Sequence, residues 1–255
     1  MSHSYLGIFS HLFSEPTYKL SWNSADLHYT YHVVRKIFSN EFTPKKNLKY
    51  VIWDMPYYIF NYDYSMNGVN FRKGLTFWKY FNDTNNLCVH REVEWKRYEL
   101  YIDMFGKKEK KRDDLCYLDD ITWSRIVTQD EINDFKKSVS HVWKLNHVET
   151  IQENIYYFKA IISIIKAFNP NIKIIVTIFP QLRYISEYFP KEFKLSKEFF
   201  YDQLKSVKED IIVWDYYDYY FDKENFFGDV LHLNNKGAAD FTRELNRHLK
   251  DENII

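Results

Sequence analysis

The chain has 255 residues, enough for one sizeable domain with a full hydrophobic core or at most two small domains. Its 35 acidic and 35 basic residues cancel, so no global electrostatic field favours nucleic acid or an anionic membrane as a partner. Two cysteines, Cys88 and Cys116, are too few for a disulfide framework, and no membrane-spanning apolar run or signal-peptide pattern occurs, so a cytoplasmic protein with reduced thiols is expected.

The first expected element is a helix over residues 25–38, with Ser24 as its N-cap. His28 and His32 lie four residues apart on this helix, a spacing that can bind a metal when a third ligand is at hand. Neither the glutamate of a zinc-protease motif nor a nearby cysteine pair accompanies them, so we predict no metal site and no cofactor. The apolar stripe of this helix consists of Leu27, Tyr31, Val34 and Phe38.

A strand is expected over residues 49–55, between Pro44 and Pro56. Asp54 lies near its carboxyl end, and open α/β sheets bind ligands at the carboxyl ends of their strands. Asp54 is therefore a candidate substrate-binding residue. The alternative, which we favour, is a structural aspartate that accepts hydrogen bonds from a loop.

Residues 61–147 form the least regular part of the sequence. The stretch 106–112 is a run of charges typical of a solvated connector. Because nothing marks a domain boundary, we interpret residues 1–255 as one domain in which residues 61–147 are an inserted cap or lid that shapes the substrate pocket. Three tryptophans are expected in the core of this insert: Trp78, Trp95 and Trp123.

Helices and strands alternate on short connections in the second half of the chain, which predicts parallel βαβ units and an α/β fold. Arg183 lies in the loop after the first of these strands and could contact an acidic group of a substrate, although we favour an exposed ion pair for it. The expected helices cover residues 149–168, 195–207 and 236 onward, and the expected strands cover residues 172–179 and 211–214.

The loop before the last helix carries the strongest signal for chemistry. Residues 215–222 are too acidic and too rich in tyrosine to continue the preceding strand inward, so Asp229 and His232 fall on a loop, with Asn234 or Asn235 capping the helix. A carboxylate bonded to one ring nitrogen fixes the tautomer of a histidine and leaves the other nitrogen to take a proton. The alternative, at even odds from the loop alone, is an aspartate that caps a turn and a histidine packed beneath a helix.

Ser2 stands at the start of the chain, in Ser2-His3-x-x-x-Gly7-Ile8, and would complete a catalytic triad with the aspartate and the histidine. With Asp229-x-x-His232 and the following Leu-Asn-x-x-Gly-Ala, the sequence resembles the SGNH (GDSL-like) hydrolase superfamily. The resemblance implies a three-layer α/β/α, flavodoxin-like fold with a parallel sheet. It also implies that Ser2 is the nucleophile, His232 the general base and Asp229 the residue that orients it.

The resemblance further implies an oxyanion hole, for which the backbone at Asn23 and Ser24 is the best candidate. The family's asparagine block should follow the strand over residues 49–55, where Met-Pro-Tyr-Tyr stands instead. Members that this chain resembles often accompany bacterial surface-polysaccharide synthesis, so the expected activity is hydrolysis of an O-acyl ester on a small molecule or carbohydrate. An O-acyltransferase of the same fold and an inactive carbohydrate-binding or assembly protein remain alternatives, and the oligomeric state stays open.

Overall fold

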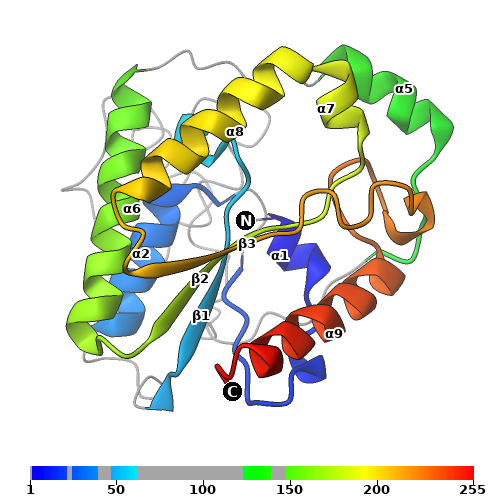
Figure 1. The fold of residues 1–255 in the computed structure, drawn as a ribbon. Helices are drawn as coiled ribbons and strands as arrows, with labels where there is room; N and C mark the ends of the chain where they lie inside the picture. The colour runs from blue at the N-terminus through cyan, green and yellow to red at the C-terminus, as the bar shows by residue number, and fades with distance from the viewer. Residues whose placement is uncertain (1, 22–24, 40–46, 63–122, 139–147) are drawn as a thin grey trace, which may run out of the picture.

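The computed structural model describes residues 2–21, 25–39, 47–62, 123–138 and 148–255. Within these residues the chain forms a parallel three-stranded sheet in the order β1-β2-β3 (Figure 1). The central strand is buried from Ile174 to its end, as its near-continuous apolar sequence predicts. The strands are β1 (Tyr50–Asp54), β2 (Lys173–Ile178) and β3 (Ile211–Asp215).

Helices pack on both faces of this sheet. On one face, Phe158 of α6 (Val148–Phe168) lies 5.5 Å from Trp53 of β1, ring centroid to ring centroid. On the other face, a histidine of α9 (Asn235–Asp251) stacks on Trp214 of β3. The fold is therefore α/β with a parallel sheet, compatible with the predicted α/β/α layering. The other described helices are α1 (Ser2–Gly7), α2 (Leu27–Phe38), α5 (Gln129–Ser138), α7 (Tyr184–Tyr188) and α8 (Pro190–Lys205).

The N-cap of α2 differs from the prediction. Asp26 caps the helix, because its Oδ1 accepts a hydrogen bond of 2.9 Å from the backbone N–H of Tyr29. The expectation that Ser24 is the cap was wrong, and Ser24 itself lies outside the described residues. A cap must stand directly before the first helical residue, and here that residue is Leu27, which is fully buried in the core.

The cap of α9 follows the prediction. Asn234 Oδ1 accepts hydrogen bonds of 3.1 Å from the N–H groups of both Lys236 and Gly237. Gly237 is needed here for space, because a Cβ at this position would lie 2.2 Å from the carbonyl oxygen of Phe226. The start of the last helix is thus locked against the loop that precedes it.

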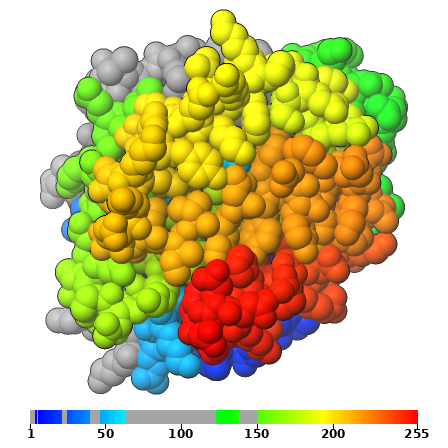
Figure 2. Space-filling view, in the orientation of Figure 1, coloured from blue at the N-terminus to red at the C-terminus, as the bar shows by residue number. Residues whose placement is uncertain are grey.

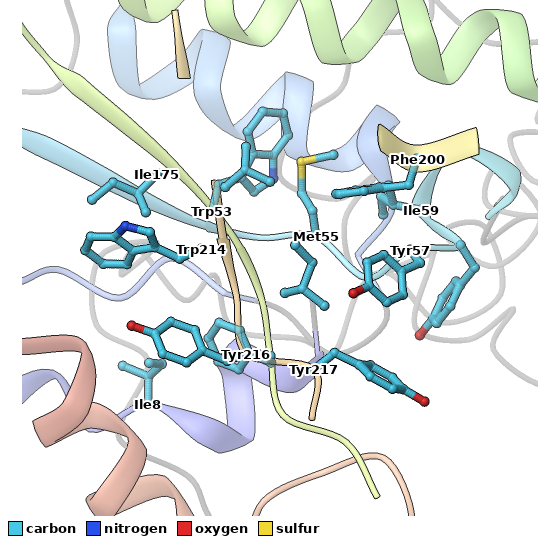
Figure 3. Close-up of a cluster of buried hydrophobic side chains, with 14 of the residues drawn as sticks. Ile8, Trp53, Met55, Tyr57, Ile59, Ile175, Phe200, Trp214, Tyr216 and Tyr217 are labelled. Carbon is cyan, nitrogen blue, oxygen red and sulfur yellow. The ribbon is translucent and has the colours of Figure 1, made fainter. Parts of the chain in front are cut away.

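The segment after β3 is a loop, as expected, but three of its four tyrosines are buried and only Tyr219 is exposed. Tyr216, Tyr217 and Tyr220 are buried, and the first two belong to the cluster of large side chains in Figure 3. Carboxylates satisfy phenol groups of this core: Asp215, the last residue of β3, accepts the hydroxyl of Tyr57 at 2.5 Å, and Asp240 of α9 accepts that of Tyr220 at 2.5 Å. The sequence interpretation missed this because it treated acidic and aromatic residues as equally outward-facing.

The N-terminal segment runs along the C-terminal helix. The N–H of Phe9 donates to Thr242 Oγ1 at 3.0 Å, and the N–H of Ser14 donates to Asn246 Oδ1 at 2.9 Å, both on α9. The two ends of the chain therefore share one region of the molecule, and α9 with the loop before it covers the lower right of the surface in Figure 2. None of the described helices is long and apolar enough to cross a bilayer.

Candidate active site

A short closed loop between β3 and α9 carries the candidate dyad. Phe227 and Leu233 form an antiparallel bridge, and the N–H of Gly228 donates to the carbonyl of His232 at 2.9 Å. Inside this loop, Asp229 Oδ1 accepts the N–H groups of Leu231 at 2.8 Å and His232 at 2.7 Å. These backbone hydrogen bonds therefore hold the carboxylate in place independently of its contact with the imidazole.

The carboxylate of Asp229 also holds the ring of His232. Both of its oxygens lie 2.9 Å from His232 Nδ1. An ionised carboxylate can only accept, so Nδ1 carries the proton and Nε2 is the nitrogen through which a proton could pass to or from a substrate. The sequence left two alternatives, a turn-capping aspartate and one that orients a histidine; in the structure one carboxylate does both.

The charge of Asp229 is well stabilised. Burial by itself raises its pKa, but the adjacent His232 and the two backbone N–H donors outweigh burial and hold the pKa of this carboxyl below its ordinary value. The side chains keep contact with solvent, 14% exposed for His232 and 27% for Asp229. The aspartate of the dyad is therefore ionised, and the dyad is not sealed inside the core.

The dyad lies at the carboxyl edge of the sheet. The N–H of Leu182, which follows β2, donates to the carbonyl of Val230 in the dyad loop at 3.5 Å. Burial, followed by the nearby Tyr62 and then by the charges of Asp54 and Asp229, raises the pKa of the Tyr58 hydroxyl, so this phenol stays protonated near both carboxylates. Parallel sheets bind ligands at this edge, because the loops after successive strands meet there.

The helix that begins with Ser2 reaches the same edge. The N–H of Ser4 in α1 donates to Asp54 Oδ2 at 2.9 Å, which ties the helix to the end of β1. At the other end of α1, a Cβ on Gly7 would lie 3.6 Å from Leu233 Cδ1, one residue after the candidate base. The backbone of Ser2 thus begins a short helix next to the dyad loop, whereas its side chain lies outside the described part of the structure.

The weaker candidates are explained by structural roles. Asp54 is 3% exposed and accepts the Ser4 N–H, a structural role as in the favoured alternative, although the donor lies in helix α1 and not in a loop. Arg183 is exposed and pairs with Asp222 at 3.0 Å and with Glu187 at 3.3 Å, again the favoured alternative. The oxyanion candidates Asn23 and Ser24 lie outside the described residues.

His28 and His32 pack against each other in the core. They are 1% and 6% exposed, and their ring centroids lie 4.6 Å apart. The ring of Tyr157 on α6 meets that of His28 edge to face at 5.1 Å. In the part of the chain that the structure describes, no third metal-binding side chain joins them.

Trp123 is the residue of this region that the sequence interpretation misplaced. It was expected in the core of the insert, but its ring meets the ring of His232 edge to face, with the centroids 5.6 Å apart. No local pattern could have predicted this, because the two residues belong to distant segments. Trp78 and Trp95, named with it, lie outside the described residues, as does most of the proposed cap at residues 61–147.

No family model, curated protein or solved structure matches this chain. The function must therefore be argued from the geometry of the dyad and its surroundings.

Proposed function

We propose that this protein is a serine-dependent O-acyl esterase of the SGNH type. The observation that carries the proposal is the bond from His232 Nδ1 to a carboxylate that the backbone fixes, in a dyad that still reaches solvent. A buried aspartate that served only as a turn cap would not need a histidine ring on both of its oxygens. The location of the dyad at the carboxyl edge of a parallel sheet supports the same proposal.

In this proposal Ser2 supplies the nucleophile. Its hydroxyl oxygen attacks the ester carbonyl while His232 Nε2 takes the hydroxyl proton, and Asp229 stabilises the imidazolium that results. The imidazolium then returns the proton to the leaving alkoxide, and an acyl-serine remains. Water, deprotonated by the same nitrogen, releases the acid and restores the serine. The backbone at Asn23 and Ser24 would be the donor to the oxyanion.

The proposed substrate is an O-acylated carbohydrate. Support comes from the resemblance of the Ser2 and Asp229-x-x-His232 motifs to polysaccharide-associated SGNH members, and so it is an argument by analogy. The abundance of aromatic residues, a fifth of the chain, is compatible with a sugar-binding surface but follows equally from compositional drift, which we favour.

The test is hydrolysis of p-nitrophenyl acetate and release of acetate from an O-acetylated oligosaccharide. We expect His232→Ala and Ser2→Ala each to lower the rate roughly a hundredfold or more, because each removes a group that acts in the transition state. His248→Gln is the matched control, since it alters another partly exposed histidine on the adjoining helix. Circular dichroism establishes that all three variants fold. Equal rates for the wild-type protein and His232→Ala would overturn the proposal, and full activity in Ser2→Ala would remove Ser2 from it.

A further inference from the structure

Trp123 packs on the dyad loop at the one place where the loop has no side chain. Its ring plane stands at 77° to that of His232. A Cβ built on Gly228 would lie 2.6 Å from the indole Cε3, closer than a Cβ can approach, and a tight 3.2 Å from the Trp123 Cβ. The indole therefore occupies the space that Gly228 leaves empty, directly beside Asp229.

The main chain holds this tryptophan in place from both sides of the loop. The carbonyl oxygen of Trp123 accepts the N–H of Asn235 at 2.7 Å, at the start of α9. Four residues later, the N–H of Val127 donates to the carbonyl of Phe227 at 2.9 Å, just before the dyad. Residues 123–127 thus bridge the two ends of the loop, and the position of the indole follows from these bonds.

A charged side chain covers the indole. The guanidinium of Arg125 lies 5.0 Å from the centroid of the Trp123 ring and pairs with Glu131. Glu131 is itself fixed by a capping box at the start of α5, where its Oε2 accepts the N–H of Thr128 at 2.9 Å and its N–H donates to Thr128 Oγ1 at 3.3 Å. A contact series therefore runs from the first turn of α5 to the imidazole.

The bond to the carboxylate does not by itself define the plane of the imidazole. Asp229 offers two oxygens at the same distance, 2.9 Å, from Nδ1, so the bond fixes that nitrogen but still lets the ring plane pivot. The torsion that turns a histidine ring has a broad minimum, so it does not fix the plane either. We infer that Trp123 is a positioning residue for His232: the indole limits the pivot of the ring and so keeps Nε2 directed at the reacting group. This inference rests on the proposed function, in which Nε2 moves the proton.

The test combines kinetics with a measurement that needs no activity. Trp123→Ala removes the indole contact, and Trp123→Phe keeps part of it. Gly228→Ala should displace the indole while the tryptophan and the two dyad residues stay the same. Ile132→Val is the matched control, because it trims a buried residue of α5 and leaves Trp123, Gly228 and the dyad unchanged. The second readout is the His232 Nδ1 proton in the NMR spectrum of protein with ¹⁵N-labelled histidine, assigned among nine histidines by its loss in His232→Ala.

We expect Trp123→Ala and Gly228→Ala to lower kcat about tenfold or more, since small misplacements of a catalytic group are costly, while KM changes less than about twofold. Trp123→Phe should recover part of the loss. In the same two variants the Nδ1 proton should exchange faster with water, and in Ile132→Val it should not. Unchanged exchange with unchanged kcat would overturn the inference, as would a rise in KM alone, which would make the indole a substrate contact. If the wild-type protein has no esterase activity, the proposed function fails, but proton exchange still decides the role of Trp123.

Discussion

Two histidines of this protein each lie against a tryptophan and each form a hydrogen bond through Nδ1, yet their bonding partners and ring contacts differ. His232 bonds to a carboxylate and meets the edge of Trp123. His248 accepts or donates a bond with the hydroxyl of Tyr216 and stacks flat on Trp214, with the ring centroids 4.0 Å apart and the planes at 11°. Burial raises the pKa of the Tyr216 hydroxyl, so the group that bonds to His248 is a neutral phenol rather than an anion.

The difference separates a dyad suited to proton transfer from a structural contact. A carboxylate stabilises the imidazolium that forms when a base takes a proton, whereas a phenol gives no such charge stabilisation. At His248 the other nitrogen, Nε2, lies 3.4 Å from Glu252, and the flat stack joins α9 to β3. We therefore expect changes at His232 to affect the rate and changes around His248 to affect stability.

The largest expected effect is that of Asp229→Asn. The amide cannot hold the imidazole in the same tautomer or stabilise its charge, so kcat should fall by roughly three to four orders of magnitude. Tyr216→Phe, which removes the corresponding partner of His248, should leave kcat within about twofold. The measurement is the esterase rate of both variants at matched folded concentration. A rate for Asp229→Asn close to that of the wild-type protein would reduce Asp229 to a turn cap.

Trp214→Ala should show the reverse pattern. Trp214 is 4% exposed and loses both its core packing and the stack with His248, so the free energy of unfolding should fall by about 3–5 kcal/mol. The activity of the folded fraction should not change, because the ring contacts of Trp214 are with His248 and Tyr216, in the region of the structural histidine. Urea unfolding followed by circular dichroism measures the first effect. A specific loss of kcat in folded Trp214→Ala would break the proposed separation of the two regions.

The third prediction concerns the start of α9, which directly follows the loop that carries His232. Alanine normally improves a helix over glycine, but Gly237→Ala would bring a Cβ within 2.2 Å of the carbonyl oxygen of Phe226. We expect overpacking to cost about 1–3 kcal/mol of the free energy of unfolding. Gly7→Ala is the matched control, because its Cβ would meet only ordinary contacts of 3.4–3.6 Å. Equal stability of the two variants would mean that the loop before α9 can shift freely.

The sequence predicts those features of the structure that depend on residues close together along the chain. The helix expected over residues 149–168 is α6 (Val148–Phe168), and the strand expected over 211–214 is β3 (Ile211–Asp215), because helical spacing and apolar runs are local patterns. The loop position of Asp229 and His232 was predicted for the same reason, and the bond between them was one of two alternatives that this loop left open.

The parts that were missed are set by contacts between distant segments. Trp123 reaches His232 through main-chain bonds to the start of α9, and no periodicity in the sequence encodes such a pairing. Tyr216 is buried, and its hydroxyl bonds to His248 of α9, 32 residues further along the chain. Even the cap of α2 depended on the fold: several residues before the helix can cap, and the burial of Leu27 decides which one does.

The smallest expected effect concerns acid stability, where the two histidine regions should again differ. The folded-state pKa of Asp229 is lowered, so the unfolded chain binds more protons at acidic pH, and the stability that this carboxylate contributes is lost as pH falls through the lowered pKa. The difference in the free energy of unfolding between the wild-type protein and Asp229→Asn should therefore shrink as the pH falls below about 4, where an unfolded aspartate also becomes protonated. Tyr216→Phe removes no carboxyl group, so its difference from the wild-type protein should not show this loss below about pH 4. Urea titrations between pH 3 and pH 7 measure both differences. A constant difference for Asp229→Asn would mean that the bonds to His232 and to the backbone do not favour the ionised carboxylate, which is the property that distinguishes this dyad from the histidine on Trp214.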